Sequence, residues 1–432
     1  VGQAGRRPAA TARELAAEGG RSASASSAVP PARRWAPELC GGGLPCADLG
    51  TVSGRAKILS SLRQREPIVL AGAWELLPAA RKWSVGRLQE HLAGATRPCH
   101  VLKAKRDVQK YTYYFKDLTD RNMPAEAMEA VPCNDALNIS FEQFMRLARD
   151  DAAHSYYLQT SLFARDPTKD DGQQPYVTSE TLKADLFGAM DSQVWRELAE
   201  AMDRPTWFRS QLFVGPVGTL GFGHFDQYDN VFLQVRGTKR ILLFDPRTGA
   251  RGLCPFPIHH PYDQRARLNL ERPDFGAFPR AAELRGAGAE AVLRPGDAVF
   301  IPSHWWHHVE STSGSPEWCV SVNFWFDGVS PRLLNPPSCL GPQLEQELAR
   351  QVEYLAADAL GAEAVGTFAA ACAEEADQAI VEADPPPDDS RLPAMNYVLG
   401  HLARILGPTG VKGFLEDYLH PERWCGLRRV CF

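Results

Sequence analysis

A histidine and an aspartate one residue apart could bind a metal ion together. His224 and Asp226 stand in the segment Gly223-His224-Phe225-Asp226, shortly before the apolar run Val231–Val235. In an extended segment, residues two apart project to the same face of the strand. A His-x-Asp pattern is common by chance, however, and two ordinary core or surface side chains are the alternative interpretation of this pair alone.

A second segment offers further ligands for the same ion. A Pro-Gly turn at Pro295-Gly296-Asp297 begins a strand that ends at Pro302, and three histidines follow: His304, His307 and His308. One carboxylate and two imidazoles form the facial triad of non-haem Fe(II) oxygenases, which keeps adjacent positions open for a cosubstrate and dioxygen. The two segments together favour a metal site, and the residues alone leave all three histidines as candidates for the third ligand.

Lys239 could bring a positive charge to the same site. It follows the turn Arg236-Gly237-Thr238 and opens the predicted return strand Lys239–Phe244, with Ile241 and Leu243 on its face. A buried ammonium group is costly unless an anion pairs with it, and a dicarboxylate cosubstrate would be such an anion. If this face is outside instead, Lys239 is an ordinary strand-edge lysine with its ammonium group in water.

Two strand residues and a tyrosine are further candidates. Asn323 and Trp325 share one face of the predicted strand Val320–Phe326, with apolar residues on the other face. A buried Asn323 needs a hydrogen-bond partner, which a metal-bound carboxylate could provide. A satisfied core amide is an equal alternative, and Tyr157 could be an ordinary aromatic core residue.

Composition and charge are those of a globular protein. The 432 residues are 44% hydrophobic, 9% aromatic and 23% charged, which argues against a collagen-like, coiled-coil or wholly disordered chain. The formal net charge is −5, so the chain lacks the basic character typical of proteins that bind nucleic acid or anionic membranes. Ten cysteines without zinc-type spacing indicate a reduced, intracellular protein, and the absence of a long apolar run predicts no membrane span.

Composition also predicts three regions. Residues 1–50 are rich in Ala, Gly, Ser, Arg and Pro and are expected to be disordered, with import into an organelle left open. Residues 51–335 are expected to form the folded domain, because short strands separated by Gly and Pro turns fill 205–330. Residues 336–432 are expected to be helical. Other predicted elements are a strand at Glu66–Leu70 and helices at Trp83–His91, 141–150, Glu345–Leu360 and Met395–Leu406.

The motifs taken together resemble a known family. From about Glu66 to Asp327, and more weakly over Glu345–Gly361, the chain is similar to the JmjC-type 2-oxoglutarate oxygenases, and most of all to an asparaginyl hydroxylase among them. The motifs that carry this resemblance are Gly223-His224-Phe225-Asp226, Asn230, Gln234-Val235-Arg236-Gly237-Thr238-Lys239-Arg240, Pro255-Phe256-Pro257-Ile258-His259-His260-Pro261, Pro295-Gly296-Asp297, Ile301-Pro302, Trp305-Trp306-His307-His308-Val309-Glu310-Ser311 and Val322-Asn323-Phe324-Trp325.

The resemblance implies a mainly β fold with flanking helices: a double-stranded β-helix, also called a jelly roll or cupin barrel, followed by C-terminal helices. It implies that Fe(II) is bound by His224, Asp226 and His307, with His308 a neighbour and His304 a bystander. The residues that match the family's 2-oxoglutarate site are Lys239, Tyr157, Asn230 and Asn323.

The resemblance also places a substrate groove beside the metal, where two departures from the family pattern occur. Gly221 replaces a threonine that touches 2-oxoglutarate, so Thr219 would have to supply that contact. The family's Arg-Gln pair, which handles the target asparagine, is here Gln264 then Arg265, in swapped order. The expected groove residues are Tyr113, Gln159, Gln264, Arg265 and Trp325.

The function expected from the resemblance is hydroxylation of a protein side chain with Fe(II), 2-oxoglutarate and O2. Asparagine is the first candidate for the modified residue, and ankyrin-repeat or transcription-factor proteins are the suggested substrates. The alternatives are a JmjC lysine demethylase, a tRNA-base hydroxylase and a non-catalytic metal-binding cupin. A homodimer paired through the C-terminal helices, in the cytoplasm or nucleus, is expected.

Overall fold

The computed structural model of the chain describes most residues after residue 33. The elements below belong to a compact unit that runs from Arg33 to Phe432. The described residues are 34–93, 95, 97–114, 131–165, 176–177, 179–313, 318–327, 340–378 and 392–427.

Among these residues, six strands form the first β-sheet, which carries two of the candidate metal ligands. Its central pairs are antiparallel, whereas the strands at its two edges pair in parallel with their neighbours. The strands lie in the order β1 (Cys40–Gly43), β13 (Gly288–Leu293), β12 (Thr238–Phe244), β15 (Trp306–Ser313), β10 (Leu220–His224) and β5 (Lys110–Tyr111).

The second sheet faces the first and is longer. Except for the parallel pair of β2 and β3, its described pairs are antiparallel. Its order is β2 (Cys46–Asp48), β3 (Ile68–Ala71), β14 (Ala298–Ile301), β11 (Asp229–Arg236), β16 (Trp318–Phe326), β9 (Trp207–Pro216), β7 (His154–Ala164), β4 (Cys99–Lys105) and β6 (Asp135–Ile139), with β8 (Tyr176–Val177) paired to β7.

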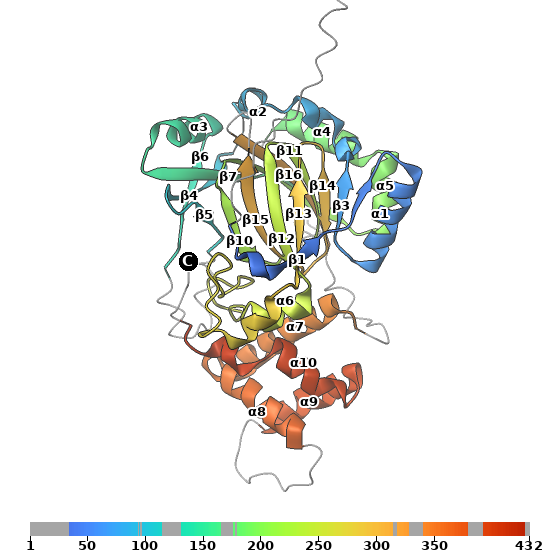
Figure 1. The fold of residues 1–432 in the computed structure, drawn as a ribbon, viewed down its shortest axis with the longest axis vertical. Helices are drawn as coiled ribbons and strands as arrows, with labels where there is room; N and C mark the ends of the chain where they lie inside the picture. The colour runs from blue at the N-terminus through green and yellow to red at the C-terminus, as the bar shows by residue number, and fades with distance from the viewer. Residues whose placement is uncertain are drawn as a thin grey trace, which may run out of the picture. The chain divides into compact units, whose positions relative to one another are not determined.

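The chain passes from one sheet to the other between most successive strands from β9 to β16, and this alternation is the double-stranded β-helix that the sequence predicts. Figure 1 shows the two sheets in the centre of the fold. Side chains from both sheets, among them Phe232 and Leu243, pack together between the sheets. The predicted fold class is therefore confirmed.

Strand β11 shows how alternation divides its side chains between two environments. Val231, Leu233 and Val235 pack into the large core on the outer face of the second sheet. Phe232, which projects to the opposite side, lies in the cluster between the sheets. Because side chains alternate along a strand, Asn230 shares the inward face with Phe232.

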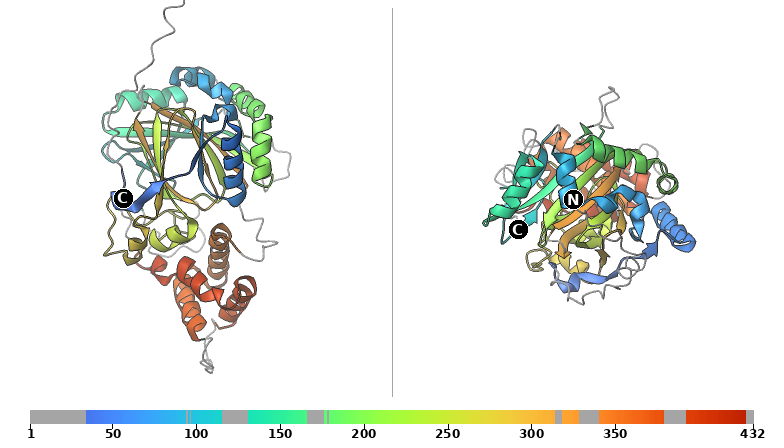
Figure 2. Two further views of the ribbon diagram at one scale, coloured as in Figure 1. Left: turned by 45° about the vertical axis from the view of Figure 1, so that its right-hand side comes forward. Right: turned by 90° about the horizontal axis from the view of Figure 1, so that it is seen from above.

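Helices cover the second sheet and extend the chain beyond the barrel. Leu62 of α1, Phe144 of α3 and Trp195 of α5 are buried in the core on the outer face of the second sheet. The C-terminal helices form a core of their own, to which α6 contributes Ala250. Figures 1 and 2 show α7 and α6 next to one end of the barrel, with α8 to α10 beyond them. The bounds are α1 (Val52–Gln64), α2 (Val85–Leu92), α3 (Phe141–Asp150), α4 (Glu180–Met190), α5 (Gln193–Ala201), α6 (Pro246–Gly252), α7 (Pro342–Leu360), α8 (Val365–Gln378), α9 (Leu392–Leu406) and α10 (Gly410–Tyr418).

The other predicted strand and helices are found with small shifts of their ends. The predicted strand at Glu66–Leu70 corresponds to β3, and the helices predicted at 141–150 and Glu345–Leu360 correspond to α3 and α7. No helix among the described residues has both the length and the apolar character needed to cross a membrane.

The folded part of the chain begins earlier than the boundary at residue 51 that the sequence predicted. Strands β1 and β2 lie within the segment expected to be disordered, and Trp35 is only 2% exposed, packed edge-on against His308. Arg34 donates to Glu271 and to two backbone carbonyl groups. The low aromatic content of this segment led to the prediction of disorder. One buried tryptophan and two edge strands are nevertheless enough to anchor it. Residues 1–33 and the predicted boundary at 335 lie outside the described residues.

Replacement of Trp35 tests this corrected boundary. We expect Trp35→Ala to lower the free energy of unfolding by about 3–5 kcal/mol, since it removes a large buried side chain from the core. Chemical denaturation measures the change. Val52→Ala is the control, because Val52 is exposed and such substitutions usually change stability by about 0.5 kcal/mol or less. Equal stabilities of the two variants would contradict the boundary.

Candidate metal centre

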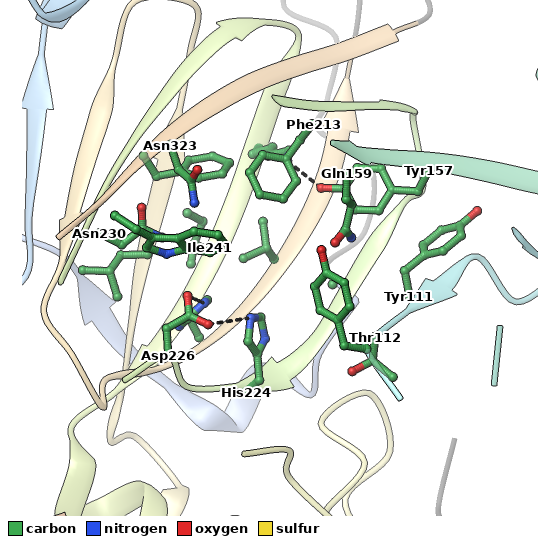
Figure 3. A pocket seen from close by; sticks show the side chains of 18 of the residues that line it. Tyr111, Thr112, Tyr157, Gln159, Phe213, His224, Asp226, Asn230, Ile241 and Asn323 are labelled. Atoms are coloured by element: carbon green, nitrogen blue, oxygen red, sulfur yellow. Dashed lines mark hydrogen bonds and ion pairs between the residues drawn. The ribbon is translucent and has the colours of Figure 1, made fainter. Parts of the chain in front are cut away.

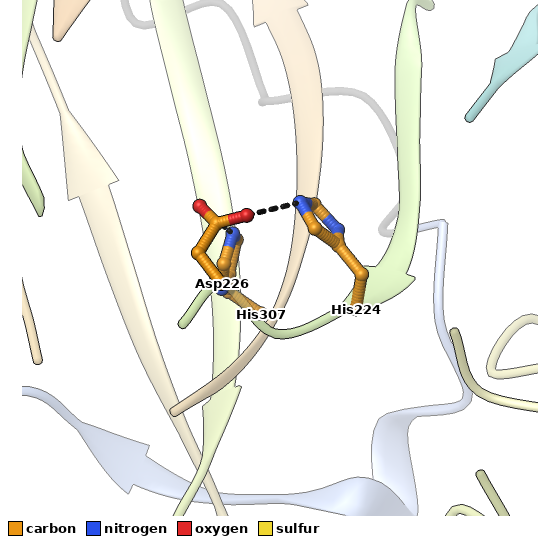
Figure 4. Close-up of side chains that lie close together, drawn as sticks. All are labelled: His224, Asp226 and His307. Carbon is orange, nitrogen blue, oxygen red and sulfur yellow. Dashed lines mark ion pairs between the residues drawn. The ribbon is translucent and has the colours of Figure 1, made fainter. Parts of the chain in front are cut away.

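The ends of two neighbouring strands bring the three predicted metal ligands together. His224 is the last residue of β10 and pairs with His307 of β15 across the first sheet. Asp226 lies in the turn between β10 and β11, and not in an extended strand with His224 as the sequence analysis assumed. The turn, instead of strand alternation, therefore brings the carboxylate back towards the two imidazoles (Figure 4).

The distances suit the binding of one ion. His224 Nε2 lies 4.0 Å from Asp226 Oδ1, and His307 Nε2 lies 3.8 Å from Asp226 Oδ2. One ligand atom from each of the three residues lies within 4.8 Å of the others. A single metal ion with bonds of about 2.0–2.2 Å can bridge such separations.

Backbone carbonyl groups orient both imidazoles. His224 Nδ1 lies 2.6 Å from the carbonyl oxygen of Phe222, and His307 Nδ1 lies 3.0 Å from that of Trp305. These contacts assign the hydrogen to Nδ1 and leave the Nε2 lone pair for a metal, as in most histidine-metal sites. Burial holds the pKa of His224 well below its usual value, and the neighbouring His307 lowers it further. His224 is therefore neutral, which is the form that binds metals.

The other two histidines of the second segment face elsewhere. His304 Nε2 contacts Glu347 of α7 at 3.0 Å. His308 Nε2 contacts the backbone carbonyl of Arg34 at 3.0 Å, on the opposite face of the sheet from His307. Strand alternation explains this difference, because His307 and His308 are consecutive in β15.

The triad lies in a cavity between the two sheets with an empty volume of about 740 Å³, part of it open to solvent. Figure 3 shows the side chains that project into it. The lining residues are Tyr111, Thr112, Tyr113, Tyr157, Gln159, Phe213, Gly221, His224, Asp226, Asn230, Phe232, Lys239, Ile241, Arg265, Ile301, His307, Val309, Asn323 and Trp325.

Lys239 faces inward and lies among aromatic rings in this cavity. It is 2% exposed, and its Nζ donates to the hydroxyl of Tyr157 at 3.2 Å. The same nitrogen lies 4.9 Å from the centre of the Phe232 ring and 5.4 Å from that of Phe213. Burial lowers the pKa of Lys239 to about 8. No carboxylate among the described residues forms an ion pair with it, so an anionic ligand would find its counter-charge here.

Two asparagines and a tryptophan present unsatisfied polar atoms at the cavity. Asn323 accepts a hydrogen bond from the backbone N–H of Gln211, which leaves its Nδ2 without a partner. Asn230 Oδ1 and Trp325 Nε1 also lack partners among the described residues. Buried polar groups are normally hydrogen-bonded, and each of these three residues lines the cavity. The two donors among them, Asn323 Nδ2 and Trp325 Nε1, thus suit a small carboxylate-bearing ligand beside a metal ion.

Arg265 is a charged group close to the metal ligands. A β-bridge joins it to His224, and its side chain is buried. Its Nε donates to the Thr112 hydroxyl at 2.7 Å. A guanidinium donates hydrogen bonds but accepts none, so this part of the cavity suits an oxygen atom of a substrate.

Two of the predicted site residues do not line the cavity. Thr219 donates its hydroxyl hydrogen to the Pro216 carbonyl at 2.8 Å, so it does not supply the cosubstrate contact expected of it. Gln264 has a positive φ of 66° and donates to the side chain of Gln227. The left-handed backbone at Gln264 turns its side chain away from the cavity and leaves Arg265 as the member of the pair that faces inward.

Gln211, which was not predicted from the sequence, holds two cavity residues in place by hydrogen bonds. Gln211 donates its side-chain N–H groups to the Tyr113 hydroxyl at 2.8 Å and to the Gln159 carbonyl at 2.9 Å. These bonds fix the positions of two predicted groove residues. A glutamine in the middle of an apolar strand was the available signal, because a fully buried amide needs partners.

Comparisons with known proteins agree with this geometry. Residues 59–331 match a family model described as a cupin-like domain. The chain is 27% identical to human tRNA wybutosine-synthesizing protein 5 over 66% of this chain and 79% of that protein. It is 36% identical to lysine-specific demethylase JMJ31 of Arabidopsis thaliana, over 24% of this chain and 18% of that protein. It is 37% identical to human HSPB1-associated protein 1, over 27% of this chain and 23% of that protein. The chain thus spans about a fifth of the last two relatives.

Substitution of two consecutive histidines tests the assignment of ligands. We expect His307→Ala to weaken the binding of Mn(II) by about 100-fold or more, beyond the roughly 10- to 100-fold loss typical of outer-shell partners. His308→Ala is the matched control and is expected to lower stability while keeping the metal affinity within about threefold of wild type, because its ring faces Arg34. Isothermal titration measures both. A larger loss of metal affinity in His308→Ala than in His307→Ala would show that the register of β15 is wrong.

Proposed function

Because this chain belongs to the family of cupin-like domains, whose JmjC-type members use Fe(II) and 2-oxoglutarate, we propose that it is a dioxygenase of that kind. The observation that carries the proposal is one cavity that combines the His-Asp-His triad with a buried lysine to which no carboxylate of the described residues is paired. A purely structural metal site would not need that lysine. A buried lysine without an anionic partner also lowers the stability of a protein core. A dicarboxylate cosubstrate accounts for both.

Each group of the cavity then has a task. Iron, 2-oxoglutarate and O2, when bound, would supply the oxidising chemistry: one atom of O2 would enter a substrate C–H bond, and the other would enter the succinate that forms from 2-oxoglutarate with release of CO2. His224, Asp226 and His307 hold the metal. Lys239 and Tyr157 bind the remote carboxylate, while Asn323 Nδ2, which has no partner among the described residues, orients the end near the metal.

The apolar part of the cavity excludes water from the reaction. Phe213, Phe232 and Ile241 surround the site of the cosubstrate. A dry cavity strengthens the electrostatic interactions of the bound groups. It also removes solvent that would compete with the substrate for the oxidant.

We propose a protein side chain as the substrate, with asparagine as the first candidate. The groove residues Tyr113, Gln159 and Trp325 all line the cavity beside the metal ligands, and Arg265 supplies donors for a side-chain carbonyl. Gln264 does not reach this region, so any asparagine is recognised differently from the pattern that the resemblance implies. Pairing of two copies through the C-terminal helices stays a prediction.

Oxidation of a tRNA base is the second candidate. One observation favours it: the similarity to human tRNA wybutosine-synthesizing protein 5 extends over 79% of that protein. The aromatic side chains of the groove could stack on a base. The formal net charge of −5 weighs against it, because binding of nucleic acid depends on phosphate contacts.

Succinate formation tests the proposal and separates the candidates. The wild-type chain, with Fe(II), 2-oxoglutarate and air, is expected to form succinate faster when a consensus ankyrin-repeat protein is added, with a mass gain of one oxygen on an asparagine. Stimulation by tRNA, or by a methyl-lysine peptide with loss of a methyl group, would identify the other substrate classes. Asp226→Ala is expected to abolish turnover. No turnover by the metal-loaded wild type would favour a binding-only cupin.

The affinity for 2-oxoglutarate should depend on pH through Lys239. Its pKa of about 8 in the free protein means that the ammonium form dominates below pH 8, whereas the amine dominates above it. A bound carboxylate favours the ammonium form, so we expect affinity to fall as pH rises above 8, by up to about tenfold per pH unit. Titration of the Mn(II)-loaded protein between pH 7 and 9.5 measures this. Lys239→Arg keeps its charge throughout and should abolish the decline; a flat wild-type profile would contradict the assignment.

A further inference from the structure

Asp226 occupies a short turn whose neighbours contact the C-terminal helix α7. The turn spans residues 225–228, between β10 and β11. The Phe225 ring stacks on the His304 ring at 5.3 Å. Gln227 Nε2 lies 3.4 Å from Glu347 Oε2. Residues on both sides of the metal ligand are therefore tied to His304 or to α7.

His304 also holds the backbone of Asp226 directly. Its N–H donates to the carbonyl oxygen of Asp226 at 2.7 Å. His304 has a φ of 65°, a left-handed conformation that costs a non-glycine residue about 1 kcal/mol or more. Such a conformation persists only where the surroundings hold it. The backbone N–H groups of Ser303 and Trp305 are also hydrogen-bonded, and the side chain of His304 adds a restraint of its own.

Glu347 provides the restraint from α7. Its Oε2 lies 3.0 Å from His304 Nε2, while its Oε1 accepts from Gln351 at 2.8 Å. His304 and Glu347 are both 1% exposed or less. A hydrogen bond to a buried carboxylate is among the stronger ones in proteins, so the contact can hold the ring of His304 in place.

We propose that Glu347 is a positioning residue for the metal ligand Asp226 and acts through His304. Loss of the carboxylate frees the His304 ring and lets the strained backbone relax, which withdraws the N–H donor from the Asp226 carbonyl. The carboxylate of Asp226 then loses its preorganised place beside the two imidazoles. This inference rests on the proposed metal site. It means that a residue of α7, outside the barrel, helps to position one of the metal ligands.

Glu353 offers a matched control on the same helix. It is also 1% exposed, and it accepts from the Ile258 backbone N–H at 2.7 Å and from Arg423 at 3.0 Å. None of these contacts reaches the turn that carries Asp226. Loss of Glu353 therefore removes a buried carboxylate from α7 without freeing the turn.

The test compares Mn(II) binding by the full chain in the variants Glu347→Ala and Glu353→Ala. We expect the dissociation constant of Glu347→Ala to rise about tenfold, the lower end of the range for supporting residues of metal sites, and that of Glu353→Ala to stay within about twofold of wild type. Hydrogen exchange of residues 225–228 in the metal-free protein gives a second readout. It should increase only in Glu347→Ala.

Two outcomes would overturn the proposal. One is an unchanged affinity and unchanged exchange in Glu347→Ala; the other is an equal loss in both variants, which would indicate general destabilisation. If Glu347→Ala does not fold, His304→Ala replaces it, because alanine makes no contact with Glu347 and, unlike asparagine, does not favour a positive φ, and the same tenfold loss is expected. Wild type that binds no Mn(II) would instead overturn the metal site itself.

Discussion

The pairing of β10 with β15 is the interaction on which the site depends. It sets His224 opposite His307, and a shift of one residue would turn His308 inward in place of His307. Contacts on the outer face of β15 hold this register. The ring of His308 lies against Trp35 and the carbonyl of Arg34, and Trp306, two residues earlier on the same face, packs on Phe225. The N-terminal segment is thus part of the support of the metal ligands, although it lies far from them in sequence.

Buried charges show which parts of the molecule are structural and which await a ligand. Asp229 accepts two hydrogen bonds from Arg65, and Asp263 forms a bidentate pair with Arg350 of α7. These groups are neutralised within the protein, as buried charges must be. Lys239 donates to the Tyr157 hydroxyl and lies among aromatic rings, and no carboxylate among the described residues pairs with it. This contrast within one protein supports the proposal of an anionic ligand at the lysine end of the cavity without reference to any relative.

The sequence predicted the fold, and most of the residues it proposed for metal and cosubstrate line one cavity, because strand alternation and motif spacing are local signals. Their roles as ligands stay a prediction. The sequence left the face of Lys239 open, since alternation gives two faces without saying which is inside. It misplaced Gln264 and Thr219, whose orientation depends on a left-handed backbone and on a turn. It could not find the contacts of Arg34, Gln211 or Glu347 at all, because these join segments that only the complete fold brings together.

The alternation of successive strands between two sheets has a consequence for how the chain folds. Strand β1 pairs with β13, β3 with β14, and β10 with β15, so most partners are separated by long stretches of chain. Such topologies fold slowly, because the entropy of closing long loops is lost before the pairings form. The ligands His224 and His307 meet only when the last strands are in place. A metal at the proposed site would therefore bind late during folding. Nascent chains without β15 lack His307 and expose strand edges, the state in which a protein of this architecture is most open to aggregation.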